Sequence, residues 1–412
     1  MALTVQNRSS SSSTSLHSAS PAIEILGPWL LNKGDVLNLH ALHQRLGERC
    51  RLAVSSNLGL PVLPASPNLL KIRWRPNLQD FSYAARKPSV KGGLSLLRRG
   101  VGLRLASTES LQRRRILDGK QLSGLIDCSG FAYGDQWPPY RMRTRARYYQ
   151  NLKARGVTLV LLPQAFGPFE KPTIREAATD ALRPFDRIYA RDETSLQHLL
   201  TLDLEPKRIH LAPDITHLVP PEYPENPEEW SNVVCIVPNA RMIDKAPKDQ
   251  AEAYFELMRS AIQQAQNHGF DTRLVLHEEN DRPLAEELQK GCGTPPPLYD
   301  DSALQTKGHL ASSHAVIGSR YHALLSSLSQ GTPAIGTSWN HKYEAMFSDY
   351  ECPNLVIKPD LPPDQIREKI DTILDPSENR ALRQSLQSAA KRQKEKVESM
   401  WKDVETRLDI ES

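Results

Sequence analysis

The stretch from residue 315 to residue 343 contains the side chains best suited to bind a charged ligand. A short apolar run, typical of a buried strand, is followed by a glycine that permits a sharp turn. Ser319 is a good N-cap residue, so Arg320 and His322 would lie in the first turn of a helix. Free N–H groups and the helix dipole attract an anion there, and Arg320 adds a planar set of donors. The pattern predicts an anion site.

A second loop is expected to bring charge to the same place. The strand predicted at residues 333–335 runs into a loop of polar and aromatic residues, Trp339, Asn340, His341 and Lys342. Because the carboxyl ends of parallel strands share one edge of a sheet, Arg320, His322 and Lys342 would converge on one phosphate- or carboxylate-bearing ligand. The alternative is that Arg320 and His322 serve only as a helix cap and an ordinary, partly buried histidine.

The first half of the chain has candidates in similar places. Ser129 and Gly130 follow a predicted strand in a loop of small residues, where a ligand can approach the backbone. Asp135, further along this loop, is a candidate general base, and a turn-capping role is its alternative. Gln164 and Gly167 follow another strand and are candidate sugar contacts.

Three more post-strand positions carry polar side chains. Arg191 is expected to face a cleft, whereas the aspartate after it is a helix cap in the alternative interpretation. His277 begins an acidic stretch that offers an imidazole and carboxylates, without the further ligands that a metal site needs. The turn formed by Asn32, Gly34 and Asp35 opens a helix, and ligand contact there is a second interpretation.

Strands and helices alternate along the whole chain. In the first half, strands are predicted at residues 22–26, 51–55, 125–128, 157–162 and 187–190, and helices up to residue 46 and at 139–155 and 192–200. In the second half, strands are predicted at residues 232–237, 272–277, 314–317 and 333–335, and helices at 249–268, 283–290, 321–330, 364–374 and 378–408. This alternation predicts two Rossmann-like α/β domains with parallel sheets that face a cleft.

The domain boundaries follow from composition. Four prolines and four glutamates between residues 219 and 229 indicate a linker. We therefore expect a disordered Ser-rich tail (1–21), an N-terminal α/β domain (22–219), the linker (220–230), a C-terminal α/β domain (231–375) and a long C-terminal helix across both domains (376–412). An organellar targeting segment is the alternative for the tail.

Composition limits the function classes. The 412 residues have a net charge of +4 and no apolar run long enough to span a membrane, and the five cysteines are too widely spaced for a disulfide or zinc motif. These features predict a cytoplasmic protein without a metal. Residues 71–120 hold thirteen Lys or Arg against three Asp or Glu. We interpret this segment as a solvated basic face or as a peripheral contact with the inner face of the membrane or an anionic substrate; no motif favours nucleic acid.

Taken together in chain order, the motifs resemble the polysaccharide pyruvyl transferase family. The resemblance is most specific in Ser319-Arg320-Tyr321-His322-Ala323, Ser329-Gln330-Gly331-Thr332-Pro333 and Lys342. It is supported by Asn32-x-Gly34-Asp35, Pro163-Gln164-Ala165-Phe166-Gly167-Pro168, Arg191-Asp192-Glu193-x-Ser195, Ala212-Pro213-Asp214, and His277 with Asp281. It covers nearly all of residues 22–345, although residues 56–120 match nothing, Ser129-Gly130-Phe131 replaces a longer glycine-rich run, and Tyr321 stands where an aliphatic residue is also common.

The resemblance implies a fold similar to GT-B glycosyltransferases and transfer of pyruvate from phosphoenolpyruvate to two hydroxyls of a sugar, giving a cyclic ketal. Phosphoenolpyruvate would be a co-substrate on the C-terminal domain, no cofactor would be needed, and the acceptor on the N-terminal domain would be a sugar or a lipid-linked oligosaccharide. His322 would act as general acid, Arg320, Lys342 and Arg191 would bind anionic groups, and Asp135 would be the base.

The resemblance also implies substrate contacts for Asn32, Gly34, Asp35, Ser129, Gly130, Gln164, Gly167, Asp214, His277 and Ser319. The alternative functions are a GT-B glycosyltransferase with a sugar-nucleotide donor and a non-catalytic carbohydrate-binding protein.

Overall fold

A computed structural model describes residues 20–28, 32–55, 69–72, 116–244, 248–337, 341–357 and 361–411. Three predictions therefore lie wholly or largely outside the described residues: the Ser-rich tail, the basic segment 71–120, and the loop at Trp339 and Asn340. No described helix is long and apolar enough to cross a membrane.

Within the described residues, the first sheet has eight parallel strands in the order β4-β3-β2-β1-β5-β6-β7-β8. Its elements are β1 (Ala22–Leu26), α1 (Lys33–Leu46), β2 (Arg51–Ser55), β3 (Leu69–Ile72), β4 (Ile116–Leu117), β5 (Gly124–Asp127), α5 (Pro139–Lys153), β6 (Thr158–Gln164), α6 (Pro172–Leu182), β7 (Arg187–Ala190), α7 (Glu193–Leu200) and β8 (Ile209–Leu211).

The part of the second half that the structure describes forms a sheet of six parallel strands in the order β11-β10-β9-β12-β13-β14. Its elements are β9 (Val233–Val237), α8 (Arg241–Asp244), α9 (Lys248–Asn267), β10 (Asp271–Val275), α10 (Arg282–Lys290), β11 (Leu298–Tyr299), α11 (Ala303–Ser312), β12 (Ala315–Gly318), α12 (Tyr321–Leu328), β13 (Ala334–Thr337), α13 (His341–Asp349), β14 (Val356–Ile357), α14 (Pro363–Leu374) and α15 (Pro376–Arg407).

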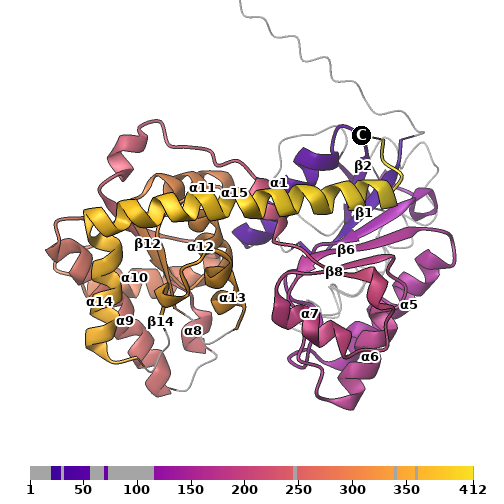
Figure 1. The fold of residues 1–412 in the computed structure, drawn as a ribbon, viewed down its shortest axis with the longest axis horizontal. Helices are drawn as coiled ribbons and strands as arrows, with labels where there is room; N and C mark the ends of the chain where they lie inside the picture. Colours follow the sequence, from indigo (N-terminus) through magenta and orange to yellow (C-terminus); the bar gives the residue numbers. More distant parts are fainter. Residues whose placement is uncertain are drawn as a thin grey trace, which may run out of the picture.

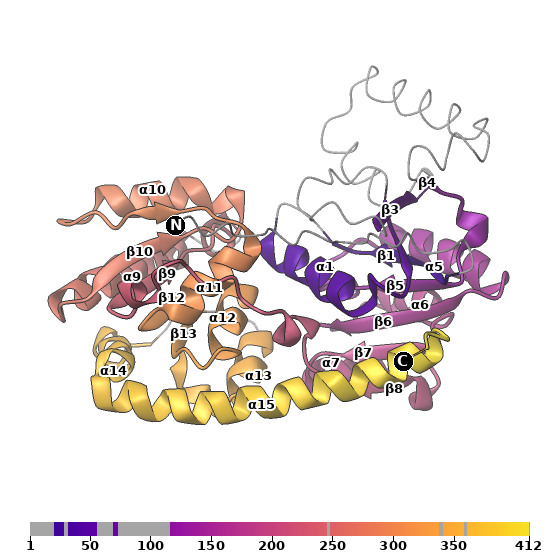
Figure 2. The same ribbon diagram turned by 90° about the horizontal axis from the view of Figure 1, so that it is seen from above.

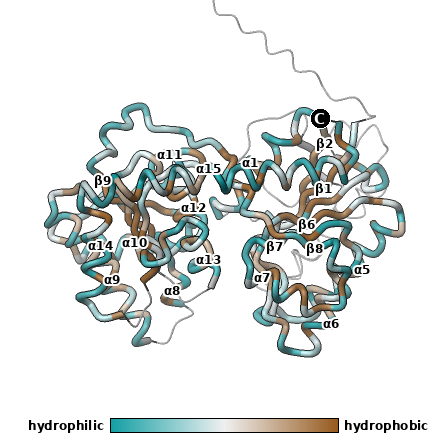
Figure 3. The backbone as a smooth tube through the Cα atoms, in the orientation of Figure 1, coloured by the Kyte–Doolittle hydropathy of each residue, from teal (hydrophilic) through white to brown (hydrophobic). Residues whose placement is uncertain are grey.

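Helix α15 joins the two halves of the molecule. It runs along both of them in Figures 1 and 2. Near its start Leu386 and Ala389 are buried in the core of the second half, and near its end Val397 and Trp401 are buried in the core of the first. Figure 3 shows the hydrophobic strands inside each half and a largely hydrophilic α15 outside. The predicted fold class, two parallel-sheet α/β halves with a long C-terminal helix, is confirmed.

The buried strands were predictable because strands covered on both faces are continuous apolar runs. β6 is an example, since all of its residues after Thr158 are buried. Helices α6 and α11 were not among the predicted elements. In α11 the buried residues include Thr306, Lys307 and Gly308, so the helix lacks the usual contrast between an apolar and a polar face.

Lys307 is buried where the two halves meet. Its Nζ donates to the carbonyl oxygen of Thr216, 2.8 Å away, in the short 3-10 helix η3 (Ile215–Leu218) that follows the first sheet. Burial, reinforced by the charge of Lys394, lowers the pKa of Lys307 to about 7, although Asp214 opposes the shift. The neighbouring Gly308 packs on the carbonyl of Glu222 so closely that a Cβ would collide with it.

Replacing Lys307 by methionine is expected to flatten the pH dependence of stability between pH 7 and pH 10.5, the folded and ordinary pKa values of this lysine. Between these values the unfolded chain binds a proton that the folded protein does not, so the wild-type free energy of unfolding rises with pH. Chemical denaturation at several pH values tests this. Lys290→Met, which removes an exposed lysine paired with Glu287, should keep the wild-type slope; the same slope in Lys307→Met would contradict the prediction.

Candidate active site

Arg320 follows β12 and is held between two carboxylates. Its Nε donates to Asp281 Oδ2 at 2.8 Å, its Nη2 donates to the other oxygen of Asp281, and its Nη1 donates to Glu278. All three side chains are buried. Glu278 and Asp281 lie in the loop after β10, a strand that β9 separates from β12 in the sheet. The orientation of the Arg320 guanidinium is therefore fixed by a neighbouring loop.

The N-cap prediction for Ser319 is wrong. Arg320 occupies the N-cap position of α12, and its side chain makes no capping hydrogen bond. The hydroxyl of Ser319 is buried instead and bonds the hydroxyls of Tyr254, at 2.8 Å, and of Thr337. The Ser319 hydroxyl therefore bonds side chains of α9 and β13 instead of capping α12, because a buried hydroxyl needs a hydrogen-bond partner.

His322 lies in the first turn of α12, as predicted. Its side chain is 11% exposed, and its Nε2 lies 3.4 Å from Asp214 Oδ2. The ring of His277 is nearly parallel to it, with centroids 6.5 Å apart. Burial, followed by the charges of His322, Lys33 and Arg320, holds the pKa of His277 well below its ordinary value, so His277 is neutral.

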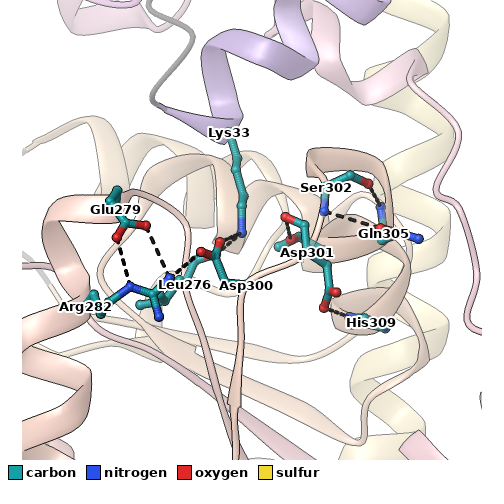
Figure 4. A network of polar contacts seen from close by, with 10 residues as sticks. Lys33, Leu276, Glu279, Arg282, Asp300, Asp301, Ser302, Gln305 and His309 are labelled. Carbon is teal, nitrogen blue, oxygen red and sulfur yellow. Dashed lines mark hydrogen bonds and ion pairs between the residues drawn. The ribbon is translucent and has the colours of Figure 1, made fainter. Parts of the chain in front are cut away.

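The start of α1 reaches across from the first half and packs on this loop cluster. Asn32 caps α1 by accepting a hydrogen bond from the Gly34 amide, at 2.8 Å, which confirms the predicted helix-opening turn. Asn32 also forms a β-bridge with Glu278. Figure 4 shows Lys33 pointing from α1 toward Leu276 and Asp300, where its Nζ donates to the Leu276 carbonyl at 2.5 Å and to Asp300 Oδ1 at 3.1 Å.

Replacing Gly34 by alanine is expected to reduce turnover and to lower the free energy of unfolding by about 1–3 kcal/mol. A Cβ at this position would overlap Nδ1 and Cγ of His322, so either the imidazole or the start of α1 must move. Denaturant unfolding and turnover assays test both effects. Gly293→Ala is the control, because a Cβ there meets nothing within 4 Å; a Gly34→Ala protein with wild-type stability and turnover would contradict the prediction.

Arg191 and Lys342 flank the ring of Tyr321. The Arg191 Cζ lies 4.1 Å from the ring centroid and the Lys342 Nζ lies 5.7 Å from it. Arg191 Nη1 donates to Asp214 Oδ2 at 3.2 Å, while its buried Nε has no hydrogen-bond partner within the described part of the chain. Burial and the charges of Arg191 and Arg320 lower the pKa of Lys342 to about 8. The charges of Arg191 and Arg320 thus reach Lys342 and disfavour its protonated form.

Lys342 was expected in a loop, but it lies in the first turn of α13. The expected convergence of Arg320, His322 and Lys342 nevertheless agrees with the charge effect of Arg320 on Lys342 and with the shared contact to Tyr321. The first half contributes Arg191, after β7, and Asp214, after β8, so residues from both sheets meet at this point.

Asp135 is placed by the structure in a turn. Its carboxylate accepts hydrogen bonds from the amides of Glu170 and Lys171, at 3.0 and 3.4 Å, just before α6. In the described part of the chain no hydrogen bond or ion pair joins Asp135 to Arg320 or His322. The turn-capping alternative therefore describes this residue, and its assignment as the general base is not retained.

The other candidates of the first half make contacts within that half. Ser129 Oγ accepts from Arg145 at 3.3 Å, Gln164 Oε1 accepts from the Ala132 amide at 3.3 Å, and the Gly130 carbonyl accepts from the Ala165 amide at 3.2 Å. Gly167 has a φ of +81° and packs against His198, which explains its residue type without a ligand. Asp35 lies near Cys128, whose thiol pKa is raised by burial and then by Asp127 and Asp35.

The sequence did not predict the contacts that Glu278, Asp281 and Tyr321 make in the site. Glu278 and Asp281 were visible as acidic residues after a strand, but their pairing with Arg320 depends on the neighbouring loop. Tyr321 was treated as a departure from a family pattern, whereas its ring contacts Arg191, Lys342 and His322. No sequence signal marks an aromatic residue for that role.

Comparisons with known proteins bear on the family and on the fold. A model of the polysaccharide pyruvyl transferase family matches residues 32–341. No curated protein matches the chain. Among solved structures, Anabaena Alr3699/HepE in complex with UDP-glucose aligns with a TM-score of 0.58 and 10% identity over 95% of this chain and 99% of that one.

Two further solved structures are similar. A UDP-glucosyltransferase from Polygonum tinctorium capable of glucosylating indoxyl aligns with a TM-score of 0.55 and 11% identity over 95% of this chain and 99% of that one. S. aureus MnaA in a co-structure with UDP aligns with a TM-score of 0.53 and 9% identity over 90% and 94%. At these identities the likeness concerns the fold alone, and it confirms the predicted similarity to GT-B glycosyltransferases.

Proposed function

The chain belongs to the polysaccharide pyruvyl transferase family, and we propose that it transfers pyruvate from phosphoenolpyruvate to two hydroxyls of a sugar unit to form a cyclic ketal. The observation that carries the proposal is the group of cations around Tyr321, supplied by both halves of the chain beside His322. The match to the family supports the class of enzyme, and the donor and the ketal are part of the proposal.

Phosphoenolpyruvate carries a phosphate and a carboxylate, so it needs clustered donors. Arg191 retains donor capacity on its Nε. Lys342 is destabilised as a cation by burial and then by the charges of Arg191 and Arg320, and a bound anion would relieve this cost. Arg320 has its Nε and both Nη atoms engaged by Asp281 and Glu278. We therefore assign direct anion binding mainly to Arg191 and Lys342, with Arg320 supplying positive charge from a fixed position.

Protonation of the methylene carbon makes the neighbouring carbon of phosphoenolpyruvate electrophilic, and His322 is the general acid in this proposal. One sugar hydroxyl then attacks that carbon, and phosphate leaves. The second hydroxyl closes the ketal and gives its proton to the departing phosphate. Once His322 has given up its proton, it can accept the proton of the attacking hydroxyl, so the same side chain serves as base. The proposal needs phosphoenolpyruvate as co-substrate and the side chains named here.

The acceptor is proposed to be a sugar of a polysaccharide or of its lipid-linked precursor. The family supports a sugar acceptor, whereas cytoplasmic location and membrane contact rest on the sequence. Substrate contact stays a prediction for Ser129, Gly130, Gln164, Gly167, Asn32, Asp35 and Ser319. The contacts described above for these residues are with other parts of the protein.

Thermal unfolding with added ligands tests the proposal. A ligand at a hundred times its Kd stabilises a protein by about 2.7 kcal/mol, so phosphoenolpyruvate should raise the midpoint visibly. Lys342→Met should reduce this shift, and Lys391→Met, which removes an exposed lysine of α15, should not. UDP- and GDP-sugars are added in parallel.

Each alternative function has its own outcome. A shift with a nucleotide sugar alone would favour a glycosyltransferase, and a response to sugars without either donor would favour a carbohydrate-binding protein. Where phosphoenolpyruvate stabilises the protein, phosphate release is then measured against a panel of sugar acceptors.

A further inference from the structure

Asp214 stands where the two halves of the site meet. It follows β8 at the start of η3, its side chain is 3% exposed, and its Oδ2 lies 3.2 Å from Arg191 Nη1 and 3.4 Å from His322 Nε2. One carboxylate oxygen therefore faces the cation of the first half and the imidazole of the second.

The remaining oxygen of Asp214 is engaged by its own loop. Oδ1 accepts from the amide of Thr216 at 3.0 Å and from its hydroxyl at 2.7 Å. A carboxylate offers about four lone-pair positions. Arg191 and Thr216 take three of them by hydrogen bonds, and His322 Nε2 lies 3.4 Å from Oδ2 without forming a hydrogen bond. Little capacity is therefore left on Asp214 to accept from a sugar hydroxyl.

The loop that carries Asp214 is fixed from the second half of the molecule. The Asp214 carbonyl accepts from His217 Nδ1 at 2.6 Å, and the His217 ring lies parallel to that of Tyr350, with centroids 6.0 Å apart. Buried Lys307 donates to the Thr216 carbonyl at 2.8 Å. Because its loop is held in place by these contacts, the Asp214 side chain is suited to orienting the side chains that it faces.

We infer that Asp214 is a positioning residue, which sets the orientation of His322 through Nε2 and couples it to Arg191 across the two halves of the chain. This inference rests on the proposed function for its catalytic consequence. Its structural content is the contact between Asp214 and His322.

The charge of Asp214 is suited to this role. Burial raises its pKa, but His322 and then Arg191 outweigh burial and hold the pKa well below its ordinary value, so the carboxylate is ionised. The ionised carboxylate attracts an N–H group, so it favours the ring orientation in which Nε2 carries a proton toward Asp214. In this inference the proton for the substrate is assigned to Nδ1, the ring nitrogen that does not face Asp214. Among the described residues, the only observation at Nδ1 is that this side of the ring packs on Gly34, where a Cβ would overlap it.

The proton transfer balances with Asp214 as a spectator. The π electron pair of phosphoenolpyruvate takes the Nδ1 proton to form a methyl group, and the positive charge passes to the carbon that bears the phosphate oxygen. The imidazole is left neutral, with its remaining proton on Nε2 facing Asp214. The Nδ1 lone pair then accepts the proton of the attacking hydroxyl, which restores the acid.

Asp214→Asn tests the inference, because asparagine keeps the size and an oxygen for Thr216 but removes the charge. We expect kcat to fall by about 10²- to 10⁴-fold, the range for loss of effective acid–base catalysis, while KM for phosphoenolpyruvate changes less than tenfold. Asp403→Asn is the matched control. Like Asp214, Asp403 is paired with an arginine, Arg187, and it also accepts a hydrogen bond from Tyr189, but it lies on the outer helix α15.

A second measurement does not depend on the reaction. In a ¹⁵N-histidine NMR spectrum the signals lost in His322→Gln identify His322, and these should move in Asp214→Asn but not in Asp403→Asn. Unmoved signals, or a raised KM with wild-type kcat, would overturn the inference. A wild-type protein that ignores phosphoenolpyruvate would instead overturn the proposed function, and the NMR spectra would still decide whether Asp214 orients His322.

Discussion

Replacing Arg320 by methionine is expected to abolish pyruvyl transfer and to lower the free energy of unfolding by about 3–5 kcal/mol. The reason is that Asp281 and Glu278 would be left buried without the cation that compensates them. Activity is lost for two reasons. The positive charge beside Lys342 disappears. The loop after β10, which also bonds Lys33 of α1, loses the arginine that holds it in place. Denaturant unfolding and phosphate release measure the two effects.

Arg282→Met is the matched control for this prediction. Arg282 also pairs with two carboxylates, Glu279 and Asp300, as Figure 4 shows, but all three are partly exposed. Exposed ion pairs contribute about 0–1 kcal/mol, so the control should lose little stability. If Arg320→Met does not fold, a double variant with Asp281→Asn should recover part of the stability, since one unpaired charge is removed. Equal losses for Arg320→Met and Arg282→Met would contradict the argument.

Replacing His322 by glutamine is expected to reduce turnover by about 10²- to 10⁴-fold while the protein stays folded and still binds phosphoenolpyruvate. Glutamine can donate a hydrogen bond to Asp214 but cannot deliver a proton to carbon. The donor-binding side chains Arg191 and Lys342 are unchanged, so the thermal shift with phosphoenolpyruvate should persist. Phosphate release with a sugar acceptor and uptake of deuterium from D₂O into the methyl group both measure the loss.

His309→Gln is a suitable control for His322→Gln. His309 lies on α11, where its ring stacks on Trp230 and lies near Asp301. Its replacement should leave both phosphate release and deuterium uptake close to wild type. If His322→Gln retains full turnover, another group protonates the donor, and the acid role assigned to His322 is wrong.

The sequence by itself determined the alternation of strands and helices and the place of several site residues along it. Buried parallel strands such as β6 are continuous apolar runs, and a polar residue that ends such a run must lie at the carboxyl edge of a sheet. From this rule we predicted His322 in the first turn of a helix and Asn32 at the start of another, and they lie there in α12 and α1. The order of the motifs was sufficient to indicate the family.

Only the tertiary structure decided which of these residues meet. Asp214 and His322 are 108 positions apart and come from different sheets, so no local pattern encodes their contact. The partners of Arg320, the buried hydroxyl contacts of Ser319 and the turn that holds Asp135 likewise depend on neighbouring loops. The physical reason is that a buried polar group is satisfied by whatever donor or acceptor the packed fold brings to it, and sequence spacing does not contain that information.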